Sequence, residues 1–206
     1  MDKRLRAALL LAAASTGGYV VISGAGAGAS ADVDHLSATL RDPAGHAVGI
    51  VRFDIDSEHL TVRATLKPSA YVTTNAFHGL HIHANGDPTN GVGCVADRSA
   101  ASSTWFVAVD GHLSVPGQTH GHHTGDLPSP LIEADGSARL VFTTDRIDPA
   151  ALAGRAVVLH NGPDNFGNVP TGTLGDQYTA NSGAATDKTS KTGNAGDRVA
   201  CGLVTR

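Results

Sequence analysis

Long apolar runs, basic charge and helical patterns are scarce in this chain of 206 residues. Beyond residue 31 no apolar stretch is long enough to cross a membrane, so the sequence predicts no transmembrane span in the remaining chain. Acidic side chains outnumber basic ones by 19 to 15, which argues against nucleic acid or an anionic membrane as a partner. No convincing amphipathic helix separates the strand-like runs, and this absence favours an all-β fold.

Residues 1–31 have the layout of a signal peptide. A basic start is followed by a mostly apolar stretch of small residues over 7–23 and by the A-x-A cleavage pattern Ala29-Ser30-Ala31. We therefore expect export to the periplasm, the cell envelope or the exterior, and one mature domain over residues 32–206. A retained membrane anchor is the alternative, although serine, threonine and glycine interrupt the apolar stretch. Cleavage would leave 12 basic and 18 acidic side chains, a formal charge of −6.

The two cysteines of the chain, Cys94 and Cys201, lie far apart in the sequence. In an exported protein, two cysteines predict one disulfide that closes a long loop. Two free, buried thiols are the alternative, and they are less common outside the cytoplasm.

Short runs that alternate apolar and polar residues predict half-buried β-strands. We expect strands at Leu36–Leu40, His46–Ile55, Leu60–Leu66, Ala138–Thr144, Ala156–His160 and Val199–Val204. Their regular recurrence, with turn residues between them, predicts an antiparallel β-sandwich or barrel. Two long stretches without periodicity, one starting at Pro88 and one over Gly162–Lys191, predict loops, and loops of this length are usually functional. We expect the apolar patch at Trp105 and Phe106 to pack on the sandwich as a flap; an aromatic interface is the alternative.

His81 and His83 form an H-I-H pattern in an apolar segment that ends at Asn85-Gly86-Asp87. In a strand, side chains two residues apart point to the same face, about 7 Å apart along the chain. Two imidazoles so placed can tilt toward one metal ion, and imidazole suits zinc, copper, iron and nickel. A lone H-x-H is more often structural. Here eight of the eleven histidines lie between positions 78 and 160, a clustering that a metal site needs and a core does not.

A glycine-containing loop concentrates further histidines and ends at a carboxylate. Its candidate ligands are His112, His120, His122, His123 and Asp126. Histidine and aspartate are ligands of zinc sites, and a solvent-exposed histidine-rich loop is the alternative. His160 closes a β-branched run, so another histidine is expected at a strand end.

Five segments carry a more specific pattern. They are G-L-H-I-H-A-N-G-D at 79–87, D-G-H at 110–112, H-T-G-D-L at 123–127, V-V-L-H at 157–160 followed by Asp164, and T-G-N-A-G-D-R-V-A-C-G at 192–202. In this order they resemble the copper/zinc superoxide dismutases, over essentially all of residues 36–206 and most closely the exported bacterial members. The resemblance implies an antiparallel Greek-key β-barrel or sandwich with two long functional loops.

The resemblance also implies roles for individual residues. Copper ligands are implied to be His81, His83, His112 and His160, and zinc ligands His112, His120, His123 and Asp126, with His112 bridging the two metals. Asp164 is implied to hydrogen-bond one ligand of each metal, Cys94 and Cys201 to form the family disulfide, and Arg198 to orient an anion over the copper.

The chain departs from the family pattern in two places. The insert between Cys94 and His112, which holds Trp105 and Phe106, is much longer than in most members. The segment from His120 to His123 is several residues shorter, so these two histidines must meet one ion across a tight turn. His122 is therefore an extra candidate ligand.

The implied activity is the dismutation of superoxide to dioxygen and hydrogen peroxide, with copper and zinc as cofactors. It needs a metal that changes oxidation state by one electron, which zinc does not. Arg198 is implied to hold the superoxide anion and His112 to accept a proton. The alternative is a non-catalytic, exported copper-binding or copper-buffering domain, against which the presence of Arg198 and every copper histidine argues. The sequence leaves the subunit count open, and this chain could pair as a homodimer through a sandwich edge or through the Trp105 flap.

Overall fold

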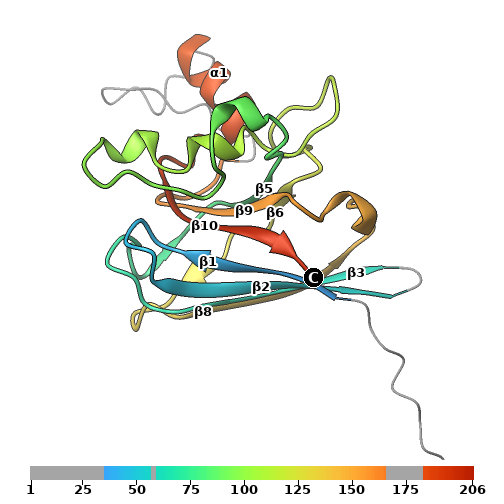
Figure 1. The fold of residues 1–206 in the computed structure, drawn as a ribbon, viewed down its shortest axis with the longest axis horizontal. Coiled ribbons are helices and arrows are strands. Elements are labelled where there is room, and N and C mark those ends of the chain that lie inside the picture. Colours follow the sequence, from blue (N-terminus) through green and yellow to red (C-terminus); the bar gives the residue numbers. More distant parts are fainter. Residues whose placement is uncertain (1–34, 57–58, 166–182) are drawn as a thin grey trace, which may run out of the picture. The chain divides into compact units, whose positions relative to one another are not determined.

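A computed structural model describes residues 35–56, 59–165 and 183–206, most of which surround a core of β-strands (Figure 1). The predicted signal peptide lies outside the described residues. The strands are β1 His35–Arg41, β2 Ala47–Ile55, β3 Leu60–Leu66, β4 Ala76–Phe77, β5 Leu80–His83, β6 Asp126–Leu127, β7 Leu131–Ile132, β8 Ala138–Thr144, β9 Ala156–His160 and β10 Arg198–Thr205. The helix α1 covers Gly183–Thr192, and short 3-10 turns lie at Pro88–Asn90, Ser102–Thr104, Val107–Val109 and Pro149–Ala151.

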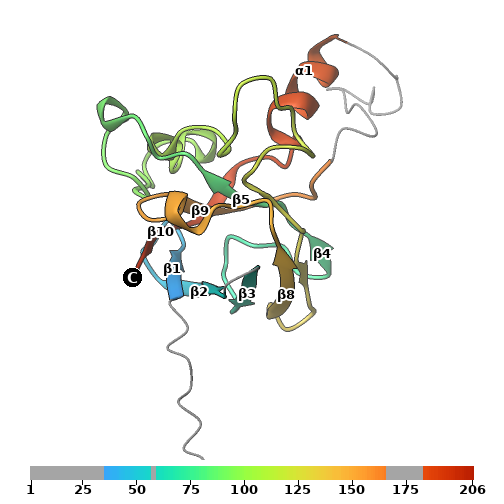
Figure 2. The same ribbon diagram turned by 90° about the vertical axis from the view of Figure 1, so that its right-hand side faces the viewer.

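Eight strands form one antiparallel sheet in the order β6-β5-β9-β10-β1-β2-β3-β8, and β4 pairs with β7 separately. The sheet curls, so that β1, β2, β3 and β8 lie in one layer and β5 and β9 in another (Figures 1 and 2). The first described strand, β1, pairs with the last, β10. The predicted all-β, antiparallel barrel or sandwich is confirmed.

The buried core follows from the alternation of apolar residues along the strands. In β3, every second residue from Leu60 to Leu66 is buried, because side chains two residues apart share a face of the sheet. These residues belong to one core cluster with Leu40 of β1 and Phe53 of β2. All five residues of β9 are buried, since the strand lies between the core and the covering loops, and its sequence is accordingly a continuous apolar run.

The prediction of a loop over Gly162–Lys191 is wrong for its last part, where α1 forms. This helix has no apolar stripe to reveal it in the sequence. It carries an ion pair between Asp187 and Lys191, one turn apart and 2.9 Å from each other, and the carbonyl of Ser190 accepts a hydrogen bond from the N–H of His120 at 2.7 Å. Figure 2 shows α1 on the side of β5 and β9 away from β1 and β2. No helix in the described part of the chain is long and apolar enough to cross a membrane.

The first long loop is covalently tied to the sheet. Cys94 and Cys201 form a disulfide with an S–S distance of 2.03 Å, as predicted. Beside it lies a second apolar cluster formed by Phe106, Val109, Ala156, Val158 and Cys201, with Cys94, Ala96 and Trp105 packed against it. The Trp105 ring also meets Tyr71 edge-on, with ring centroids 5.6 Å apart. The aromatic insert therefore packs on the sheet as the expected flap.

Candidate metal centre

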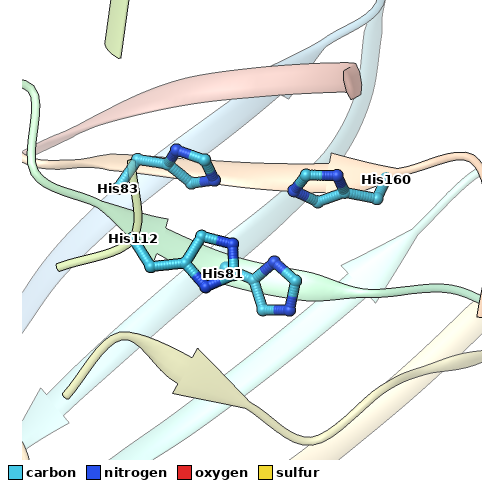
Figure 3. A group of neighbouring side chains, drawn as sticks. All are labelled: His81, His83, His112 and His160. Atoms are coloured by element: carbon cyan, nitrogen blue, oxygen red, sulfur yellow. The ribbon is translucent and has the colours of Figure 1, made fainter. Parts of the chain in front are cut away.

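Four predicted ligands converge over the antiparallel pair β5 and β9. His81 and His83 lie on β5, and His160 is the last residue of the paired strand β9. His112 lies in the first loop, where its backbone forms an isolated β-bridge with that of His83. Figure 3 shows the four rings grouped around a common space. One ligand nitrogen from each lies within 4.8 Å of those of the others, and all four residues are buried. We call these residues the four-histidine cluster.

Backbone carbonyls fix which nitrogen of each ring faces the common space. Nδ1 of His83 donates to the carbonyl oxygen of Asp110 at 2.9 Å, and Nδ1 of His160 donates to that of Gly196 at 2.9 Å. In the four-histidine cluster, one buried nitrogen of each ring has no hydrogen-bond partner among the described residues: Nδ1 of His81 and Nε2 of His83, His112 and His160. Buried polar atoms without partners are costly and rare, so this donor set fits a bound metal ion.

A second group, which we call the His/Asp cluster, adjoins the first and shares His112 with it. Oδ1 of Asp126 lies 2.9 Å from Nδ1 of His112, 3.3 Å from that of His120 and 3.4 Å from that of His123. The Nδ1 atoms of His123 and His112 are 3.3 Å apart. Tetrahedral ligands held at about 2.0–2.1 Å from zinc would be about 3.3 Å from one another. The spacing therefore fits zinc. His81 also lies near this group, but its Nε2 donates to Asp164.

The shortened segment between His120 and His123 forms a tight turn around Asp126. The second carboxylate oxygen of Asp126 accepts hydrogen bonds from the backbone N–H of Gly121 at 2.7 Å and of His123 at 3.0 Å. Gly121 has a φ of 87°, a conformation that glycine adopts without strain. The turn directs His120 and His123 inward and leaves His122 exposed, so His122 belongs to neither cluster.

Asp164 lies between the two clusters. Its Oδ2 accepts a hydrogen bond from Nε2 of His81 at 2.9 Å, and its Oδ1 lies 2.8 Å from Nε2 of His120. The carboxylate is fully buried. A Cβ at Gly193 would collide with both Asp164 and His120, so glycine is the residue that fits there.

Burial keeps most of the four-histidine cluster uncharged. It lowers the pKa of His112 to about 4 and that of His160 to about 3, and it holds the pKa of His83 well below the ordinary value. Neutral imidazoles are the form that binds a metal. The cluster is therefore ready to coordinate at neutral pH.

In the His/Asp cluster, His120 and Asp126 carry charge. Burial opposes a charge on His120, but hydrogen bonds to Asp126 and Asp164 outweigh burial and raise the pKa of His120 to about 9. Burial likewise disfavours the charged Asp126, yet hydrogen bonds from His112 and His120 hold its pKa well below the usual range. A proton is therefore held where the zinc ligand set was predicted.

Arg198 lies beside the four-histidine cluster at the start of β10, in register with His160. Its Nη1 donates to the carbonyl oxygen of Phe106 at 2.6 Å and its Nη2 to that of Asp110 at 2.6 Å. Burial lowers the pKa of Arg198, and its charge contributes to the lowered pKa of His83. The insert thus holds the guanidinium near the cluster.

Two residues at the site received no role in the sequence analysis. His78 is fully buried, with Nδ1 2.8 Å from the carbonyl oxygen of His160 and Nε2 2.8 Å from that of Thr73. Asp110 contacts both His83 and Arg198. In the sequence, His78 could have been noticed because it lies close to the H-I-H pattern, and Asp110 because it is part of the D-G-H segment.

Comparison with known proteins agrees with this geometry. The family described as copper/zinc superoxide dismutase matches residues 47–204. The chain belongs to this family. A Cu-Zn superoxide dismutase of Mycolicibacterium paratuberculosis is 36% identical over 192 residues, which cover 88% of this chain and 80% of the relative. The Cu-Zn superoxide dismutase of Mycobacterium tuberculosis is 36% identical over 176 residues, which cover 82% of this chain and 69% of the relative.

One less similar relative and one solved structure also match. An extracellular Cu-Zn superoxide dismutase of Brugia pahangi is 30% identical over 176 residues, covering 81% of this chain and 73% of the relative. Among solved structures, that of the clock protein EA4 superposes with a TM-score of 0.58 at 23% identity, covering 84% of this chain and 94% of the other. At this identity the superposition shows the fold alone.

Proposed function

We propose that this chain is an exported copper/zinc enzyme that converts superoxide to dioxygen and hydrogen peroxide. Two superoxide ions and two protons are consumed for each dioxygen and hydrogen peroxide formed. The observation that carries this proposal is the set of four buried ring nitrogens that share one space without hydrogen-bond partners among the described residues. Family membership and the adjacent Arg198 support it.

The two clusters divide the metals by the chemistry of their donors. Four imidazoles suit copper, so His81, His83, His112 and His160 would hold it. Three imidazoles and a carboxylate at tetrahedral spacing suit zinc, so His112, His120, His123 and Asp126 would hold that ion. Copper, when bound, supplies the one-electron redox couple that the reaction needs. His112 belongs to both ligand sets.

The substrate is a small anion, and Arg198 supplies a fixed positive charge for it. Because its two Nη atoms are anchored to backbone carbonyls, the guanidinium is oriented before substrate arrives. A preorganised donor does not have to reorient during the reaction. The chain as a whole is negatively charged, so attraction must be local, and Lys191 on α1 is the other nearby cation in sequence.

Proton supply falls to His112. Reduced superoxide must gain protons to leave as hydrogen peroxide, and Nε2 of His112 is buried and faces the four-histidine cluster. Its Nδ1 lies 2.9 Å from Oδ1 of Asp126, so the side of the ring away from the four-histidine cluster is held while Nε2 takes up and releases a proton. A copper-buffering domain would need neither this arrangement nor Arg198.

We further propose that residues 1–31 direct export and are removed, leaving a mature domain over 32–206. The disulfide supports an oxidising compartment, and one relative is an extracellular enzyme. The acidic charge of the chain argues against nucleic acid as a partner. A homodimer stays a prediction.

The test is metal analysis of the purified mature protein together with a superoxide-consumption assay. His83→Ala should abolish superoxide consumption and lower copper content while zinc is retained, because His83 belongs only to the four-histidine cluster. His122→Ala is the matched control, since that side chain is exposed in the neighbouring turn, and it should leave rate and both metals unchanged. A copper-loaded wild-type protein that does not consume superoxide would favour the copper-buffering alternative.

A further inference from the structure

Asp110 has a backbone conformation that is nearly exclusive to glycine. Its φ is 63° and its ψ is −159°, a region in which a side chain is sterically strained. Residues held in such a conformation require a surrounding structure that enforces it, and they concentrate at functional sites. Glycine would avoid the strain, so the aspartate side chain must contribute something that glycine cannot.

The carbonyl oxygen of Asp110 joins two parts of the proposed active site. It accepts a hydrogen bond from Nδ1 of His83 at 2.9 Å and another from Nη2 of Arg198 at 2.6 Å. One oxygen atom therefore sets the orientation of an imidazole in the four-histidine cluster and of the guanidinium beside it. A rotation of this peptide would move both together.

The carboxylate of Asp110 is anchored to the turn that follows β5. Its Oδ2 accepts hydrogen bonds from the backbone N–H of Gly86 at 2.6 Å and of Asp87 at 3.0 Å. Its Oδ1 accepts one from the side-chain amide of Asn90. The turn is held on its other side by Asn85, whose amide donates to the carbonyl of Gly154 at 2.7 Å. The carboxylate thus fastens the strained residue to a turn that is itself fixed.

We infer that Asp110 is a positioning residue, whose anchored carboxylate holds its own strained backbone so that its carbonyl aligns His83 and Arg198 for binding a small monovalent anion. This inference rests on the proposed function in placing copper in the four-histidine cluster. It does not require turnover. The purely structural alternative is that the carboxylate only stabilises the turn at 86–90, without effect on the cluster.

Three substitutions separate these possibilities. Asp110→Ala removes the anchor and keeps the steric strain, and Asp110→Gly removes the anchor and relieves the strain, so it should fold even if the alanine variant does not. Asp110→Asn keeps an oxygen for the two backbone N–H groups, and Asn90 can turn its amide to donate or accept as required. Asp97→Ala is the matched control, because Asp97 also caps a turn in the first loop through Ser99.

The measurements use the full mature protein loaded with Cu(II) and zinc, with azide as the anion probe. The alanine and glycine variants should bind azide about tenfold more weakly than wild type and show a changed Cu(II) electron paramagnetic resonance spectrum. The asparagine variant and the Asp97→Ala control should match wild type in both. Unchanged azide affinity and spectrum in the glycine variant, whatever its melting temperature, would overturn the inference, as would an asparagine variant as weak as the glycine one.

Superoxide consumption by the same samples distinguishes this inference from the proposed function. If wild type binds azide and the variants weaken as expected but no sample consumes superoxide, the proposed function fails and the positioning role stands. If wild type consumes superoxide rapidly while the glycine variant binds azide as wild type does, the positioning role fails and the proposed function stands.

Discussion

Nε2 of His81 lies 2.9 Å from Oδ2 of Asp164, and neither side chain is exposed to solvent. The other carboxylate oxygen lies 2.8 Å from Nε2 of His120. A single buried carboxylate therefore contacts one member of each cluster and orients both rings. Partners of this kind fix the tautomer and direction of a ligand, so the two proposed metal sites should depend on the same side chain.

Asp164→Ala should weaken the binding of both metals. Alanine offers no oxygen to either imidazole, so His81 and His120 both lose the contact that orients them. We expect copper and zinc affinities to fall by roughly 10–100-fold, measured by competition with chelators. Asp187→Asn, which removes an exposed carboxylate on α1, should change neither. Loss of only one metal would show that Asp164 does not couple the sites.

Zinc affinity should rise with pH up to about 9. In the metal-free protein the pKa of His120 is raised to about 9, so at neutral pH a proton must leave before zinc can bind. Raising the pH removes the proton that competes with zinc for His120. The zinc affinity should therefore increase about tenfold per pH unit between roughly 7 and 9, and then level off. Titration with a competing zinc indicator at several pH values measures this, and a flat profile would contradict it.

Arg198 should control the superoxide rate without controlling metal content. Arg198→Glu should cut the rate by orders of magnitude, because it reverses the charge beside the cluster. Arg198→Lys should lie between, since a point charge keeps the attraction but loses the planar fork that reaches two carbonyls. Arg139→Glu, on the opposite layer of the sheet, is the control for the same charge change.

The wild-type rate should also fall with added salt, because salt screens the attraction between charges over about 8 Å at physiological ionic strength. Variants with a lower melting temperature but an unchanged superoxide rate would show that Arg198 has only a structural role.

The disulfide should be a major source of stability. It joins residues 107 positions apart, and closing a loop of that size stabilises by roughly 4–5 kcal/mol in the chain-entropy model. Replacing Cys94 and Cys201 by serine should lower the unfolding free energy by about that amount in a denaturant titration. Thiol titration of the unfolded, unreduced wild-type protein should find no free thiol, and two free thiols would contradict the pairing.

Much of the fold could be predicted because strand patterns are local. Leu60–Leu66 was predicted with the bounds that β3 has, since the alternation of side chains follows from strand geometry. The helix α1 could not be predicted, because what supports it is a contact with the first loop, in which the carbonyl of Ser190 accepts a hydrogen bond from the N–H of His120. That contact joins residues 70 positions apart in the chain.

By itself, the sequence determined the longer strands, the pair of cysteines, and the residue types and order that mark the family, but not the two-residue strands β4, β6 and β7. Only the tertiary structure decided how the candidates are used. It turned His122 to solvent and His123 inward, placed Asp164 between His81 and His120, and gave Asp110 a contact with Arg198. The physical reason is distance along the chain. Strand periodicity arises within a few covalent bonds, whereas the direction of an imidazole is set by a hydrogen bond to a partner that only folding brings near.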